Sequence, residues 1–161
     1  MIESTRRATL LLTMTAFSNA RMVSAVSKLL SEFCRCLVDD PDVAARFYMV
    51  AQELAENLMK YSSGSNISVS AELLSQDGAL TLRLEARNRT TPERLRAAEL
   101  HLRELTSAKD PVALYDRLIL ETAPKLNESG LGLARIRAEG GFNLNYRIDG
   151  DELTVSVDTP V

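Results

Sequence analysis

Two separated stretches of the chain decide its fold: ELAENLMKY at residues 53–61 and SGLGL at residues 129–133. The first has apolar residues at helical spacing, with Glu53, Asn57 and Lys60 along the edge beside them. The second is a glycine-containing loop that leads into a helix. Together they predict a site for a nucleoside triphosphate and its metal ion.

Length, charge and composition indicate a single globular domain over residues 1–161. The net charge of −3 argues against a dedicated nucleic-acid binder, because such proteins carry a basic excess. No run reaches the ~20 apolar residues that a transmembrane helix needs, so no membrane contact is expected. Cys34 and Cys36 lack the partners of a zinc site and are interpreted as the reduced cysteines of a cytoplasmic protein.

The N-terminal residues allow two interpretations. Arg6 and Arg7 precede an apolar run, which is similar to a short signal peptide. Glu3 and the threonines within the run argue against it, and residues 9–15 have the composition of a strand that begins a domain. The strand is the favoured interpretation.

Periodicity along the chain predicts the element order β-α-α-β-β-α-α-α-β-β. Strands are expected at about 9–15, 67–73, 80–86, 142–148 and 153–157, and helices at about 19–37, 42–61, 92–105, 111–122 and 131–140. Asp77-Gly78 is a strong hairpin signal between two of the strands. Because the helices are grouped between hairpins, the order predicts an α+β two-layer sandwich, with helices on one face of a mixed, mostly antiparallel sheet.

The first motif has the residue types that phosphoryl transfer uses. Asn57 can give Mg²⁺ one neutral oxygen, while phosphates supply others. Glu53 can accept a proton from an attacking hydroxyl or orient it, and Lys60 can neutralise phosphate charge. The alternative is an ordinary amphipathic helix whose exposed edge holds these residues, since Glu and Lys are common on helix surfaces.

The second motif places Gly130 and Gly132 on either side of Leu131, and Leu133 heads the helix that follows. Glycines let backbone N–H groups approach a phosphate closely, and a helix N-terminus adds a partial positive charge. Leu131 and Leu133 are expected to anchor the loop to the core. Taken alone, the motif is a weak signal, and the alternative is a plain turn before a helix.

In this combination the motifs resemble those of the GHKL ATPase superfamily. Glu53 and Asn57 match its N-box, Lys60 and Tyr61 stand in the usual following positions, and residues 130–133 match its second glycine box. The element order resembles its Bergerat fold across nearly the whole chain. The resemblance implies ATP and Mg²⁺ as ligands, with Asn57 as the metal ligand.

Within the superfamily, the chain is similar to the stand-alone kinases of bacterial partner switching, the RsbW and SpoIIAB type, and most of all to the SiaB-like branch. That resemblance implies phosphorylation of a serine or threonine on a STAS-domain antagonist. It also implies that two copies can pair through the early helix and strand. A sensor histidine kinase is not expected, because His101, the only histidine, falls at what should be a solvated helix position.

One departure from the superfamily follows the strand at residues 80–86. The first glycine box, DxGxG, reads adenine through its aspartate, whereas Asn88 stands at that strand parity here and the next residues include no glycine. The Asn88 oxygen can accept from adenine N6, and its NH₂ group can donate to N1. After the second glycine box, Arg135 and Arg137 are expected to point outward.

Two main functions follow from the sequence. The favoured one is an ATP- and Mg²⁺-dependent protein serine/threonine kinase, in which Glu53 acts on the hydroxyl and the nucleotide site comprises Asn57, Lys60, Tyr61, Asn88, Gly130, Leu131, Gly132 and Leu133. The rival is a degenerate domain that sequesters a regulator without turnover, motivated by the missing first glycine box. A third is nucleotide binding with weak hydrolysis only. Residues 91–124 would be a lid in the kinase and a docking surface in the rival.

Overall fold

The computed structural model describes residues 7–17, 20–63, 66–122 and 131–161. The predicted element order is confirmed. The elements are β1 (Arg7–Phe17), α1 (Ala20–Leu37), α2 (Pro41–Tyr61), β2 (Asn66–Gln76), β3 (Ala79–Arg89), α3 (Pro92–Ser107), α4 (Pro111–Thr122), α5 (Leu131–Ala138), β4 (Asn143–Asp149) and β5 (Glu152–Pro160).

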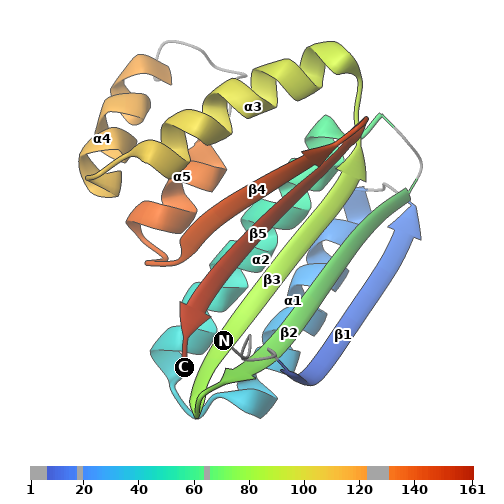
Figure 1. Ribbon diagram of the computed structural model, residues 1–161, viewed down its shortest axis with the longest axis vertical. Coiled ribbons are helices and arrows are strands. Elements are labelled where there is room, and N and C mark those ends of the chain that lie inside the picture. Colours follow the sequence, from blue (N-terminus) through green and yellow to red (C-terminus); the bar gives the residue numbers. More distant parts are fainter. Residues whose placement is uncertain (1–6, 18–19, 64–65, 123–130) are drawn as a thin grey trace, which may run out of the picture.

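The strands form one sheet in the order β1-β2-β3-β5-β4 (Figure 1). Every pairing between neighbours is antiparallel, so the mixed component expected from the sequence does not occur among the described strands. Asp77 and Gly78 connect β2 to β3 with φ angles of 52° and 83°. Positive φ at both central residues is what a type I′ hairpin turn requires, so the Asp-Gly prediction is confirmed.

The two faces of the sheet differ in chemistry, which makes a two-layer sandwich. Along β3, Leu82, Leu84 and Ala86 are buried, and the residues between them are half-buried. On the outer face Arg83 pairs with Asp158 of β5 at 2.6 Å. Figure 1 shows α1 and α2 behind the sheet and α3, α4 and α5 grouped beside β4. The predicted α+β architecture is confirmed.

Helix α2 carries the first motif, and its start is fixed by local signals. The Asp40 carboxylate accepts hydrogen bonds from the backbone N–H groups of Asp42, at 2.9 Å, and Val43, at 3.3 Å. Such an N-cap contributes about 1 kcal/mol, and Pro41 fits the first helical position that follows it. The apolar residues at helical spacing then form the buried stripe: Val43, Phe47, Val50, Leu54 and Leu58. The polar edge of the motif is thereby left beside α5.

No helix in the described part of the chain is both long enough and apolar enough to cross a membrane.

Candidate functional site

Gly132 brings the two sequence motifs into direct contact. A Cβ atom at this position would lie 2.2 Å from Glu53 Oε2 and 3.4 Å from Asn57 Nδ2. The first distance is far inside van der Waals contact, so only glycine lets α5 begin this close to α2 with Glu53 as placed. Because Gly132 has no side chain, the start of α5 can lie against α2, and the two sequence motifs are brought together. Gly130, the other glycine of the predicted loop, lies outside the described residues.

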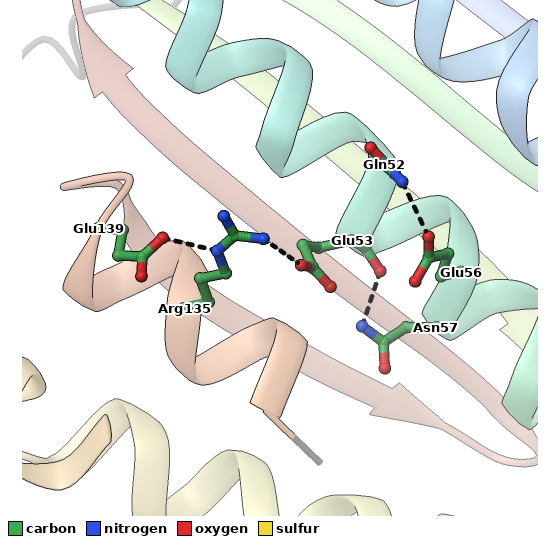
Figure 2. Close-up of polar contacts among 6 residues, drawn as sticks. All are labelled: Gln52, Glu53, Glu56, Asn57, Arg135 and Glu139. Carbon is green, nitrogen blue, oxygen red and sulfur yellow. Dashed lines mark hydrogen bonds and ion pairs between the residues drawn. The ribbon is translucent and has the colours of Figure 1, made fainter. Parts of the chain in front are cut away.

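Asn57 is oriented by a hydrogen bond within α2. Its Nδ2 donates to the backbone oxygen of Glu53 at 2.7 Å. Figure 2 shows its side-chain oxygen directed away from that bond, which leaves an acceptor for a cation or a donor. A small cavity of ≈ 60 Å³ adjoins it, lined by Glu53, Glu56, Asn57, Lys60 and Gly132.

The oxygen-rich lining of this small cavity suits a hard cation such as Mg²⁺, which prefers oxygen ligands. Among the described residues, no group of three or more His, Cys, Asp or Glu side chains could hold a metal ion. A magnesium ion here would therefore take most of its ligands from phosphates and water, with Asn57 as the protein donor the sequence predicts. Lys60 is exposed, and its ammonium lies 5.2 Å from the centroid of the Tyr61 ring.

Arg135 is the site residue that sequence reasoning missed. Instead of pointing outward, it lies between two carboxylates (Figure 2). Its Nη1 donates to Glu53 Oε1 at 3.3 Å, and its Nε donates to Glu139 Oε2 at 2.6 Å. A signal was present, because residues three apart on a helix share a face, and Gly132 already faces α2. The expectation for Arg137 was also wrong: it donates to the backbone oxygens of Leu105 and Ala108 near the end of α3.

The environment of Glu53 raises the pKa of its carboxyl. Burial is the largest cause, followed by the negative charge of Glu56, and Glu139 adds to the same effect. The hydrogen bond and charge of Arg135 act in the opposite direction but do not outweigh burial. A carboxylate with a raised pKa is a better proton acceptor, and such perturbed groups are common at catalytic sites.

A larger cavity of ≈ 140 Å³ continues from Asn57 between α2, α3 and the sheet. Its wall is mainly apolar and comprises Leu54, Leu58, Ala86, Ala97, Ala98, Leu102, Leu133, Leu153 and Val155. Four residues bring polar groups to it: Asn57, Tyr61, Asn88 and His101. His101 was expected in solvent and is instead half-buried on this wall, because its face of α3 packs over the cavity. Leu133 is 7% exposed, and Leu131 packs partly buried against the core.

Asn88 lies at the cavity where strand parity predicts it. It lies on the same helix-facing side of β3 as Ala86 and is 6% exposed. Its Nδ2 atom is buried without a hydrogen-bond partner among the described residues. An unmet buried donor costs about 1–3 kcal/mol, so this nitrogen is a candidate for contact with a ligand.

The connection from β3 to α3 is held by hydrogen bonds to neighbouring segments. The Thr90 hydroxyl donates to the backbone oxygen of Tyr61 at 2.7 Å, and its N–H donates to the oxygen of Asp151 at 3.0 Å. The backbone N–H of Ser63 donates to the oxygen of Arg89 at 3.0 Å. These bonds tie the end of α2 to the end of β3 and fix the cavity wall without glycines.

Comparison with known proteins supports the fold. No protein-family model matches the chain, and no curated protein matches it. Among solved structures, a chain in the crystal structure of the SiaB-SiaC complex from Pseudomonas aeruginosa is similar, with a TM-score of 0.67 and 14% sequence identity. The similarity covers 93% of this chain and 89% of that chain. The two chains therefore share one fold over nearly their whole length.

Proposed function

We propose that this protein binds ATP with Mg²⁺ and transfers the terminal phosphoryl group to a serine or threonine of a protein partner. The observation that carries the proposal is the close approach of Gly132 to Glu53 and Asn57, beside a mainly apolar cavity that Asn57 also lines. The same cavity is lined by the buried Asn88, whose Nδ2 has no hydrogen-bond partner among the described residues. This arrangement separates a polar end, suited to phosphates, from an apolar end, suited to a base.

Each side chain at the polar end has a role that its surroundings support. The Glu53 carboxylate, with its raised pKa, accepts the proton of the attacking hydroxyl as the new O–P bond forms and the bond from the terminal phosphorus to the leaving ADP oxygen breaks. The Asn57 oxygen is the protein ligand for Mg²⁺, which supplies charge neutralisation when bound. Lys60 adds a positive charge beside the same cavity. Gly132 lets the N-terminus of α5, with its partial positive charge, approach a phosphate.

The proposed partner is a STAS-domain antagonist in bacterial partner switching, in the cytoplasm. Its support is the resemblance of the two motifs to the stand-alone kinases and the shared fold with a chain from a two-protein complex. Residues 91–122, which form α3 and α4, would cover the cavity as a lid, since His101 and Leu102 of α3 line it.

The roles of Glu53 and Asn57 can be distinguished by two measurements. One is phosphoryl transfer from radiolabelled ATP to a candidate STAS-domain protein, and the other is nucleotide binding. Glu53→Gln is expected to abolish transfer and to leave nucleotide binding intact, because only the proton acceptor is removed. Asn57→Ala is expected to abolish Mg²⁺-dependent binding. Glu32→Gln on the exposed face of α1 and Asn145→Ala on β4 make the same chemical changes away from the cavity and should do neither. Unchanged transfer in either site variant would contradict the assignments.

A second candidate is a binding module without turnover. Two observations favour it: Arg135 already bonds to Glu53, and the β3–α3 connection lacks flexible glycines. Large apolar side chains also lie exposed on α3 and α4, with Leu100, Val112 and Leu120 at 68%, 53% and 76% exposure. Under this alternative, a partner protein would bind equally well to the wild type, Glu53→Gln and Asn57→Ala, and none of the three would transfer phosphate.

A further inference from the structure

The geometry points to a cavity that takes 6-oxopurine nucleotides as well as 6-aminopurine ones, with Asn88 reading position 6 of the base. The inference rests on the proposed function, because it concerns the base of the nucleotide in the same cavity. It goes further by naming the ligand class and the residue that sets it.

The Asn88 side chain is a buried polar group with apolar neighbours. Its strand neighbours in the sheet are Ile67 of β2 and Leu153 of β5, both buried and apolar. Asn88 is itself 6% exposed, and no group of the described chain accepts a hydrogen bond from its Nδ2. A donor buried among apolar groups is costly unless a partner arrives. The missing partner is therefore a hydrogen-bond acceptor on a ligand that enters the cavity.

The cavity that Asn88 lines is mainly apolar. The wall is built mainly from aliphatic side chains of α2, α3, α5, β3 and β5, which suits the faces of a planar aromatic ring. Asn57 lines both this cavity and the small polar one beside Gly132, and its nitrogen is already used by the backbone of Glu53. A nucleotide with its phosphates at the small cavity would place its base in the larger one, which Asn88 lines.

An amide at that position differs from a carboxylate in its hydrogen-bonding groups. A carboxylate offers only acceptors, so it selects the amino group at position 6 of adenine. An amide offers one acceptor and two donors on opposite sides, and the terminal torsion of asparagine is roughly two-fold. With NH₂ toward position 6, Asn88 donates to O6 of hypoxanthine or guanine while its oxygen accepts from N1–H. Rotated, its oxygen accepts from N6 of adenine and its NH₂ donates to N1.

The rotation of Asn88 costs little because nothing described in the chain holds Nδ2 in place. Selection of adenine alone would need a second residue that fixes the amide in one orientation. The cavity should consequently accept both purine classes with similar affinity.

The experiment is a calorimetric titration of the full chain with ADP and with IDP, in Mg²⁺. The two diphosphates differ only at position 6 and at the N1 proton, and neither carries a phosphoryl group for the proposed transfer. The wild type is expected to bind them with dissociation constants within about tenfold of each other. The Asn88→Asp variant is expected to bind ADP as the wild type does. Its affinity for IDP should be about a hundredfold lower, because a carboxylate repels O6 of the base. Asn145→Asp makes the same change on an exposed residue of β4 and should leave the ratio unchanged.

Two outcomes are decisive. If the wild type binds ADP but binds IDP with an affinity about a hundredfold lower, the inference is overturned and the proposed function stands. No binding of either diphosphate would overturn the proposed function and the inference with it. Should Asn88→Asp fail to fold, Asn88→Leu replaces it, since an apolar residue should weaken both ligands and leave their ratio near one. The wild-type ratio decides the inference without any variant.

Discussion

At the scale of single residues, Glu53 sits where its charge is destabilising. Its side chain is 18% exposed, Glu56 lies on the same helix, and Glu139, which directly follows α5, adds a further negative charge. Arg135 offsets only part of this cost, so the pKa of the Glu53 carboxyl stays above its usual value. Proteins retain such a destabilising charge where function needs it, which makes the cost itself an argument for a functional role.

Glu53→Gln should stabilise the protein at neutral pH. Glutamine has the shape of protonated glutamic acid, but its side chain does not ionise as the pH rises. Because the folded pKa lies above the unfolded value, the folded state holds more protons in the window between the two, and the wild type loses stability as pH rises through that window. The Tm of the variant minus that of the wild type, measured by calorimetry, should therefore grow as the pH rises from the usual pKa of the carboxyl through its raised folded value. A difference that shrinks over this range would contradict the environment described for Glu53.

Arg135→Met should move the acid limb of the pH–rate profile to higher pH. The hydrogen bond and charge of Arg135 lower the pKa of Glu53, so their loss leaves burial, Glu56 and Glu139 to raise it further. A higher pKa means that less of the base is ionised at a given acidic pH. Arg135→Lys should restore part of the shift, and Arg147→Met on exposed β4 should cause none. Loss of rate with an unmoved acid limb would assign Arg135 a purely structural role.

At the scale of elements, the site depends on how closely α5 approaches α2. The closest atom to a Cβ at Gly132 would be the end of the Glu53 side chain, which can swing away. At Gly140, by contrast, a Cβ would lie 2.4 Å from the backbone oxygen of Ile136, which cannot. The two glycines therefore serve different purposes: one leaves room for the carboxylate, and the other allows the chain to turn after α5.

We therefore expect Gly132→Ala to lower activity and Gly140→Ala to lower stability. Gly132→Ala displaces the Glu53 carboxylate, so phosphoryl transfer should fall by at least about tenfold, while the unfolding free energy changes by no more than about 1 kcal/mol. Gly140→Ala forces the backbone to shift and should lower the unfolding free energy by about 1–3 kcal/mol. Denaturant titration and the transfer assay measure the two effects. An equal loss of stability in both variants would contradict this division.

Local signals made the elements predictable, and the contacts between elements were harder to foresee. Asp77-Gly78 and the helix break before Asp42 act over a few residues, so sequence alone located a hairpin and a helix start. Asn88 was placed correctly because side chains in a strand alternate with a period of two. Arg135 and His101 were misplaced because their surroundings depend on the docking of α5 and α3, which no local pattern specifies.

At the scale of the whole molecule, the packing of α1 on α2 distinguishes the two cysteines. Cys34 is fully buried in the core, and burial raises the pKa of its thiol to about 11. Cys36 is exposed. Iodoacetamide at pH 8 should therefore label Cys36 in the native protein and reach Cys34 only after unfolding in denaturant, because the thiolate is the reactive species. Mass spectrometry identifies the labelled residue, and equal native labelling of both would contradict the packing of α1.

The central claim is that the cavity between α2, α3 and the sheet binds a nucleoside triphosphate with its metal ion at Asn57. The most direct test is calorimetric titration of the purified protein with a non-hydrolysable ATP analogue, with and without Mg²⁺. Binding in the micromolar range, about −8 kcal/mol, that requires Mg²⁺ and is lost in Asn57→Ala is the predicted result. No binding up to millimolar ligand would contradict the claim and leave the protein as a module that holds a partner without nucleotide.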